Sequence, residues 1–364
     1  MLAQPEFGHI LPLLPILDRL RGQGHELIVV ATQETRNVIE APGHKVELWT
    51  EDQPVSDAVR SRTGYSFWYE FTQEQKISMR DAVGQRLDAL VRRHQPDHFV
   101  VDSLFPLSFG IDCSQAPLYG RTTIVGIILP RWDVTLRRMA SPLVYLCPAA
   151  FEVPAFVIRH PMVHYGEPSC GQMFNVSGDA QEAQTGKPLV LVGFGTQASL
   201  QRSFLTRIAA VDQVAADHPD IEFVVALGKS HLEAVSQCGL KTKENVSLRT
   251  RVPQRAMLQR ASAFITHGGL SSIKEAILTG VPFIVTPEVF DQPFNAMRAE
   301  FHGIGSALFH DELSAKSIHS ELDGILGRTA KSEKLLQFQE LFRQSEAQPR
   351  TADIISEHIT RQGV

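Results

Sequence analysis

The chain has 364 residues, 43% of them hydrophobic and 21% charged, which is typical of a globular protein large enough for two separate cores. Its 40 acidic and 35 basic residues give a net charge of -5 with no long run of either sign, so nucleic acid is not expected as a partner. The 4 cysteines form no CxxC pair, and neither a secretory signal nor an apolar run of membrane-spanning length is evident. We therefore expect a cytoplasmic protein without a membrane span.

The first half of the chain alternates helical segments with short apolar runs. Residues 6–32, EFGHILPLLPILDRLRGQGHELIVVAT, predict a helix that ends near Gly22, has Pro12 and Pro15 near its start, and leads into a strand at 27–31. The apolar stripe of this helix consists of Ile10, Leu13, Leu14, Leu17 and Leu20. Further strands are predicted at 45–50, 98–102 and 122–127.

The second half repeats this alternation, with strands predicted at 188–196, 221–228, 245–250, 263–269 and 281–287. The stretch 148–187 is rich in Pro, Gly, Ser and Gln and has no sustained periodicity, as expected of a linker. We therefore predict an α/β protein with two doubly wound parallel-sheet domains. The expected parts are an N-terminal domain at 1–168, a linker at 169–187, a C-terminal domain at 188–345 and a terminal amphipathic helix at 346–364.

Doubly wound sheets bind ligands at the carboxyl ends of their strands, so the turns after the predicted strands are candidate sites. In THGGLSSIKEA, residues 266–276, a strand is followed by two glycines and a helix start with unpaired amide groups, an arrangement that suits a phosphate. His267 adds a neutral or cationic donor, and Glu275 can accept hydrogen bonds from ribose hydroxyls. Taken on its own, the HGG turn is better explained by a tight turn with a serine cap. The polar residues after Pro287 favour a ligand site.

Several motifs occur together in this half: VPQ (252–254), THGGLSSIKEA (266–276), GVP (280–282), DQPFNA (291–296) and HGIG (302–305). In order and spacing they resemble the signature of the family 1 glycosyltransferases. The resemblance implies a GT-B fold, in which two Rossmann-like domains face each other across a cleft. It also implies a nucleotide-sugar donor, either a UDP-sugar or a dTDP-sugar, and a small-molecule acceptor, without a metal or another cofactor.

The resemblance also assigns roles to residues of the C-terminal domain. Gln254 and the backbone of Val252 would face the base, and Glu275 the ribose. His267 and the amides at the helix start after Gly269 would bind the diphosphate. Asp291 and Gln292 would bind the hydroxyl groups of the transferred sugar. The GFGT turn (193–196) would form a second phosphate-facing loop. The predicted donor-binding residues are Gly195, Thr196, Arg251, Val252, Gln254, His267, Gly269, Ser271, Ser272, Glu275, Asp291 and Gln292.

The N-terminal segment contains Gly8, His9 and Pro12 in the GHxxP pattern, from which the same family draws its catalytic base. By this resemblance His9 would be the general base, and Asp102, at the end of a later strand, would orient its imidazole. In a purely structural alternative, His9 is a turn residue and Asp102 caps a helix. The GHxxP pattern and the matching motifs of the C-terminal half favour a catalytic role. An acceptor hydroxyl that loses its proton to His9 would attack the anomeric carbon and invert its configuration.

The acceptor is the least defined part of the prediction. The aromatic cluster GYSFWYEF (64–71) supplies Phe67, Trp68 and Tyr69 as candidate acceptor-binding residues, although a place in the core explains such a cluster equally well. The pairs at 94 and 98 and at 160 and 164 have HxxxH spacing, but each contains a proline that prevents a helical ligand face, so no metal site is expected there. A monomer and a homodimer both remain open.

The chain departs from the family pattern in ways that leave alternatives open. Only MLAQ precedes Pro5, so the first strand is expected to be truncated, and the segment after Asp102 is short. Arg251 stands where the family has a base-stacking tryptophan. Two further functions are therefore weighed: a nucleotide-sugar-binding protein without turnover, and a sugar-nucleotide epimerase of the same fold. The DQPFNA and GHxxP segments argue against the epimerase.

Overall fold

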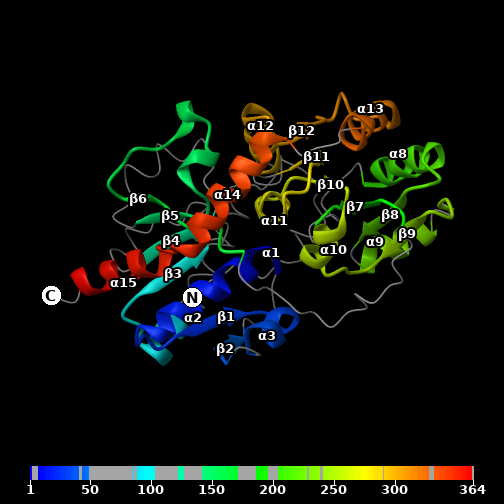
Figure 1. Ribbon diagram of the computed structural model, residues 1–364. Helices are drawn as coiled ribbons and strands as arrows, with labels where there is room; N and C mark the ends of the chain where they lie inside the picture. Colours follow the sequence, from blue (N-terminus) through cyan, green and yellow to red (C-terminus); the bar gives the residue numbers. More distant parts are fainter. Residues whose placement is uncertain are drawn as a thin grey trace. The chain divides into compact units, whose positions relative to one another are not determined.

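The protein is an α/β structure whose sheets are built from parallel strand pairs, as predicted (Figure 1). The computed structural model forms two compact units: unit 1 comprises the described residues up to 170 with 345–362, and unit 2 comprises 186–344. The structure describes residues 1, 7–40, 43–48, 85, 88–102, 122–126, 142–170, 186–195, 204–227, 229–237, 241–289, 291–327 and 332–362.

Unit 2 contains a six-stranded parallel sheet in the order β12-β11-β10-β7-β8-β9. Its strands are β7 (Leu189–Gly193), β8 (Glu222–Ala226), β9 (Val246–Arg249), β10 (Ala263–Thr266), β11 (Phe283–Val285) and β12 (Ser306–Ala307). The order reverses between β7 and β10, where Gly193 pairs with Thr266. This reversal is the topological switch point at which doubly wound sheets bind ligands.

The helices of unit 2 follow its strands along the chain. They are α8 (Phe204–Asp217), α9 (Lys229–Gln237), α10 (Gln254–Arg260), α11 (Leu270–Thr279), α12 (Gln292–His302), α13 (Ala315–Leu326) and α14 (Glu333–Ala347). α11 ends at Gly280, whose φ of 64° places it in the left-handed region that glycine adopts without a steric cost. Ser314 and Ser317 form a capping box at the start of α13.

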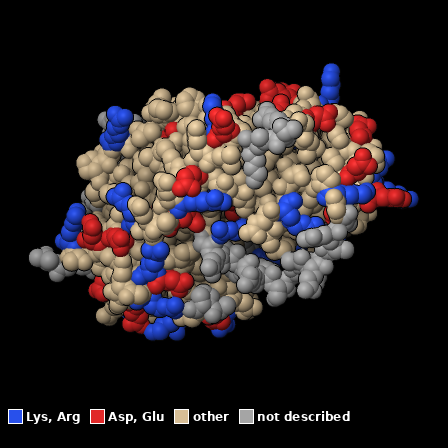
Figure 2. All heavy atoms as spheres, in the orientation of Figure 1, with Lys and Arg blue, Asp and Glu red and all other residues tan. Residues whose placement is uncertain are grey.

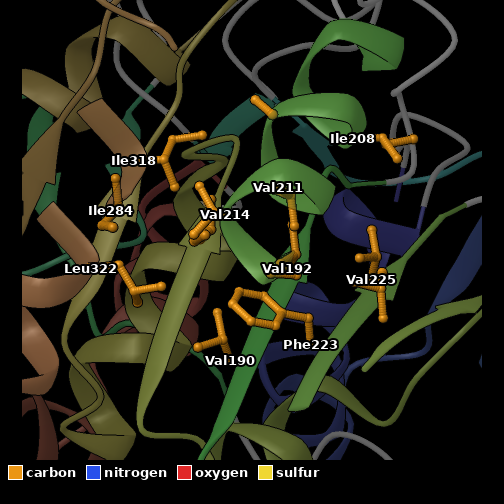
Figure 3. Close-up of a cluster of buried hydrophobic side chains, with 14 of the residues drawn as sticks. Val190, Val192, Ile208, Val211, Val214, Phe223, Val225, Ile284, Ile318 and Leu322 are labelled. Carbon is orange, nitrogen blue, oxygen red and sulfur yellow. The ribbon is translucent and has the colours of Figure 1, made fainter. Parts of the chain in front are cut away.

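One apolar core joins the sheet of unit 2 to α8 and α13 (Figure 3). β7 and β8 supply alternate apolar side chains such as Val192 and Val225, because successive residues of a strand point to opposite faces. α8 contributes Val211 and α13 contributes Ile318 and Leu322, all of them buried. Since both helices bury their apolar stripes in the same core, they pack against each other.

Unit 1 contains parallel strands in two groups. β1 (Ile28–Ala31) pairs with β2 (Lys45–Leu48), while β3 (Phe99–Asp102), β4 (Thr122–Gly126), β5 (Leu143–Tyr145) and β6 (Val163–Tyr165) form a four-stranded sheet. The interpretation of all of 148–187 as a linker is wrong, because β6 and the 3-10 helices η4 (Ala149–Phe151) and η5 (Pro154–Phe156) lie within it. Strands of three residues are too short to show a period.

The opening helix is divided where its prolines fall. α1 (Phe7–Ile10), the 3-10 helix η1 (Leu11–Leu13) and α2 (Leu14–Gly22) follow one another, because proline has no amide hydrogen to continue the helical hydrogen bonds. The five residues of the predicted apolar stripe are all buried. Residue 1 pairs with β1, since Val30 N donates to the Met1 carbonyl at 2.9 Å. α3 (Gln33–Glu40) follows β1, and a further helix ends at residue 94.

The C-terminal helix α15 (Thr351–Gln362) belongs to unit 1 and packs against α2. At its exposed side, Gln23 Nε2 donates to Asp353 Oδ1 at 2.7 Å. At its buried end, Glu167 Oε2 accepts from the amides of Arg350 at 2.9 Å and Thr351 at 3.0 Å, and from the Thr351 hydroxyl at 2.8 Å. One buried carboxylate therefore closes the N-terminus of this helix.

Basic and acidic side chains are interspersed over the face of the protein drawn in Figure 2. A mixed surface of this kind has no extended field of one sign on that face. Among the helices that the structure describes, none is both long enough and apolar enough to cross a bilayer.

Candidate nucleotide-sugar site

The loops that follow β7 and β10 meet at the switch point of unit 2. Thr266 ends β10, and His267 Nδ1 lies 3.2 Å from the carbonyl oxygen of Gly193, at the end of β7. A Cβ atom at Gly195 would lie 2.5 Å from His267 Nε2, and one at Gly269 would lie 2.6 Å from the same atom. The absence of a side chain at both positions leaves room for the imidazole, because any larger residue would push the ring away. The structure brings these three predicted donor-binding residues together.

The hydrogen bond of His267 determines which of its nitrogens can act on a ligand. Burial lowers the pKa of His267 to about 4, so the ring is neutral near pH 7. Since a carbonyl oxygen can only accept, Nδ1 carries the proton, and Nε2 has a lone pair instead of a hydrogen. Of the two predicted forms of this donor, neutral and cationic, the neutral ring donates from Nδ1 to the Gly193 carbonyl. Nε2 can donate to a diphosphate only after the ring takes up a proton, which a nearby dianion would favour. That His267 binds a diphosphate stays a prediction.

The first turn of α11 is the second part of this site. Its N-cap is Gly269, which has no side chain to cap the helix, and Leu270 N donates to Asp291 Oδ2 at 3.3 Å. Ser271 is half-buried and Ser272 is buried. Amides of a first helical turn have no partner within the helix, and they lie at the positive end of the helix dipole. This end of α11 can therefore bind an anion such as a diphosphate.

Three residues predicted to contact the donor form one hydrogen-bonded group. Gln254, the first residue of α10, donates through Nε2 to Glu275 Oε2 at 2.7 Å and to Ser272 Oγ at 3.3 Å. Burial raises the pKa of Glu275, while the hydrogen bond from Gln254 opposes this shift. A half-buried carboxylate held in this way can accept hydrogen bonds from a diol such as a ribose.

The residues predicted to bind the transferred sugar hold neighbouring loops in this structure. Asp291 accepts from Asn295 Nδ2 at 2.7 Å in addition to its bond from α11. Gln292 Oε1 accepts from the amides of Glu288 and Val289, each at 3.0 Å. Both side chains are therefore fixed before any ligand binds. Whether their remaining polar atoms contact a sugar stays a prediction.

Two further residues support this loop: Asn295, which the sequence indicated among the polar residues after Pro287, and Arg298, which it did not. Asn295 Nδ2 also donates to the Gly268 carbonyl at 2.9 Å, and Arg298 Nη1 donates to Asn295 Oδ1 at 3.0 Å. Both side chains are buried. Asn295 and Arg298 follow the N-cap Asp291 by four and seven residues, a spacing that repeats on one face of a helix. This polar period is the signal that could have identified Arg298.

The other predicted residues lie apart from these contacts or outside the described residues. Arg251 is exposed and Val252 is half-buried, both in the segment between β9 and α10. Thr196 and the three candidate acceptor residues Phe67, Trp68 and Tyr69 lie outside the described residues.

Unit 1 brings together the two residues predicted to be catalytic. His9 lies in α1 and Asp102 ends β3, and His9 Nδ1 is 2.9 Å from Asp102 Oδ2. The His9 side chain is 24% exposed and that of Asp102 4%. A carboxylate that binds Nδ1 fixes the tautomer in which Nε2 is the basic nitrogen. The pair has the geometry of an oriented general base.

Comparisons with known proteins find similarity in both units of this chain. The family model described as erythromycin biosynthesis protein CIII-like, C-terminal domain, matches residues 209–360. NDP-glycosyltransferase YjiC of Bacillus licheniformis is 22% identical over 395 residues, which cover 99% of this chain and 97% of that protein. The similarity to YjiC therefore extends over both units.

Solved structures show the same architecture. The glycosyltransferase of kitacinnamycin superposes with a TM-score of 0.75 at 19% identity, covering 98% of this chain and 97% of the other. UGT89C1 of Arabidopsis thaliana, solved in complex with UDP, has a TM-score of 0.70 at 15% identity and covers 100% of this chain and 98% of its own. At these identities the likeness establishes the fold, which is GT-B.

Proposed function

Since the chain belongs to the family 1 glycosyltransferases, enzymes that use nucleotide sugars, we propose that it transfers a hexose from a UDP-sugar to a hydroxyl group of a small lipophilic acceptor with inversion. The observation that carries this proposal is the His9–Asp102 hydrogen bond of 2.9 Å, because binding a nucleotide sugar without turnover would require no oriented base.

Unit 2 would bind the donor. The start of α11 would hold the diphosphate through the amides of Ser271 and Ser272, and Glu275 would bind the ribose. Negative charge grows on the diphosphate as the bond to the anomeric carbon breaks. Fixed amide dipoles lower the free energy of that transition state more than that of the bound donor, and this difference accelerates the reaction.

Unit 1 would supply the base. The acceptor hydroxyl gives its proton to His9 Nε2 while its oxygen forms the new bond to the anomeric carbon. The electron pair of the broken bond leaves with the nucleoside diphosphate on the opposite face, so the configuration inverts. Asp102 stabilises the imidazolium that forms, because its carboxylate is bound to Nδ1.

The test is a transfer assay by mass spectrometry with UDP-glucose and a panel of phenolic and terpenoid acceptors. We expect one acceptor class to gain a hexose. We expect His9→Ala to lower the rate by about 100-fold or more, since general bases contribute on the order of 10² to 10⁴. UDP affinity, measured by calorimetry, should stay unchanged in this variant. His160→Ala, an exposed histidine of unit 1, is the matched control.

Other outcomes identify the alternatives. UDP binding without transfer to any acceptor would point to a binding protein. Conversion of the donor to an epimer without an acceptor would point to an epimerase. Transfer that persists in His9→Ala would contradict the assignment of the base, and higher activity with dTDP-sugars would change the donor but not the mechanism.

A further inference from the structure

A cluster of two histidines and two aspartates lies in unit 2 at the end of α8 and along α13, on residues that the proposed transfer does not use. His319 Nε2 is 3.1 Å from Asp323 Oδ2, and His218 Nε2 is 3.5 Å from the other oxygen of the same carboxylate. The two imidazole rings lie with their centroids 4.8 Å apart and their planes tilted by 36°. Asp217 Oδ2 lies 3.5 Å from His319 Nδ1. All four side chains therefore belong to one compact group.

One atom of this group has no hydrogen bond. His218 Nε2 is buried, and within the part of the chain that the structure describes its 3.5 Å contact with Asp323 Oδ1 is an ion pair too long for a good hydrogen bond. A buried polar atom without a hydrogen bond costs free energy, and native structures rarely leave one without a reason. The atom faces the Asp323 carboxylate and lies next to His319. A cation bound between these residues would satisfy it.

The fold holds the cluster in place without a ligand. His218 directly follows α8, and its carbonyl accepts from Asn245 Nδ2 at 2.9 Å, which fixes the backbone there. His319 and Asp323 are four residues apart on α13 and so share one face. The neighbouring residues Ile318 and Leu322 anchor α13 in the core that also buries α8 (Figure 3). The side chains therefore need only small rotations to converge on an ion.

We propose that His218, His319 and Asp323 bind a divalent first-row transition metal ion, for which Zn²⁺ is the best match. One potential ligand atom from each lies within 4.8 Å of the others. Ligands of a tetrahedral zinc ion, each about 2.0 to 2.1 Å from the metal, stand roughly 3.4 Å apart. The two nitrogen-to-oxygen distances, 3.5 Å to Oδ1 and 3.1 Å to Oδ2 of Asp323, are close to that value, and a small rotation of the carboxylate would present one oxygen to the ion.

The chemistry of the group selects among metals. Two imidazole nitrogens favour zinc, copper or nickel over calcium and magnesium, which prefer oxygen ligands. Asp217 can accept a hydrogen bond from His319 Nδ1 and so direct Nε2 towards the ion, as second carboxylates do in many zinc sites. With neutral histidines, the two aspartates carry two negative charges, which a divalent cation balances. The ion would join α13 to the end of α8.

The experiment measures zinc binding by the full chain, after removal of metals with a chelator, by calorimetric titration with zinc chloride. We expect one site with a dissociation constant in the micromolar range or below. His319→Ala and Asp323→Asn should weaken it by more than about tenfold, because losing even a residue that only supports a ligand costs that much. Zinc should also raise the thermal midpoint of the wild type and leave that of His319→Ala unchanged.

His310→Ala is the matched control, because His310 is an exposed histidine in the turn before α13. This variant should bind zinc as the wild type does. Cobalt chloride provides a second measurement, since tetrahedral coordination by nitrogen and oxygen gives intense visible absorption that His319→Ala should lose. Equal zinc affinity in the wild type and His319→Ala, or no site in the wild type, would overturn the proposal and leave a solvated ion-pair cluster only.

Discussion

Two helices of this protein begin in buried surroundings, and their first turns differ. At α15, Glu167 of the same chain accepts three hydrogen bonds from the helix start. At α11, the N-cap is Gly269, and the imidazole beside it is neutral because its pKa lies at about 4. A carboxylate of the chain contacts both helix starts, since Asp291 Oδ2 accepts from Leu270 N at 3.3 Å at the start of α11. The difference is that Glu167 binds the start of α15 three times, whereas α11 has a glycine N-cap beside a neutral imidazole, which suits an anion from outside.

The largest effect is expected at the closed helix start. Glu167→Ala removes the acceptor and leaves buried amides without a partner, which we expect to cost about 3 kcal/mol. Hydrogen exchange of residues 351–362 should accelerate by roughly a hundredfold, and exchange at β7 and β10 should not change. Asp353→Ala is the control, because Asp353 makes an exposed contact of the same helix. Equal effects of the two variants would show that Glu167 does not close the helix.

A pH dependence of stability is expected at His267, beside the start of α11. His267 has a pKa of about 4 in the folded protein against an ordinary value of 6.5 for an exposed histidine, so the unfolded chain binds more protons between these values. Folding therefore weakens as the pH falls from about 6.5 to 4, by about 3 kcal/mol at the lower limit. Hydrogen exchange at β10 between pH 7 and pH 4.5, corrected for intrinsic rates, measures it. His267→Asn should flatten this dependence, and an unchanged slope would be evidence against a buried neutral ring.

The smallest effect is expected at the nucleotide base. Arg251 is exposed and occupies the position where the family resemblance places a stacking tryptophan. Arg251→Trp should therefore tighten UDP binding by roughly fivefold, because stacking of a base on an aromatic ring contributes about 1 kcal/mol or more. Titration calorimetry with UDP measures this change. Affinity that stays constant would indicate that the base does not lie against this residue.

The sequence predicted most of the helices and strands whose apolar residues repeat over a stretch long enough to be recognised. Five apolar residues over three turns identified the opening helix, and short apolar runs identified β1, β3, β7 and β10, strands of four or five residues. β5, β6 and β12 escaped, since strands of two or three residues have no readable period. β11 also has three residues, but it was identified between the flanking GVP segment and Pro287. Length alone therefore does not decide which short strands the sequence reveals.

The sequence predicted which residues form the candidate site, but it did not predict which atoms those residues hydrogen-bond. The motifs indicated His267, Gln254 and Glu275, and the structure brings them to the switch point. The state of the imidazole depends on the register that places Gly193 opposite Thr266, which no local pattern encodes. Asp291 likewise bonds to the start of α11, a contact across 21 residues. Long-range partners of this kind follow from the packing of the whole sheet.

The central claim is that the start of α11 binds the diphosphate of the donor, and UDP affinity in two matched glycine variants tests it most directly. Gly269 has a φ of -58°, which alanine adopts without strain, but a Cβ there would lie 2.6 Å from His267 Nε2. Gly324 lies in α13 with nothing within 4 Å of such an atom. We predict that Gly269→Ala weakens UDP binding by about tenfold or more, a loss of about 1.4 kcal/mol, while Gly324→Ala leaves it unchanged. A folded Gly269→Ala variant that binds UDP as tightly as the wild type would contradict the account.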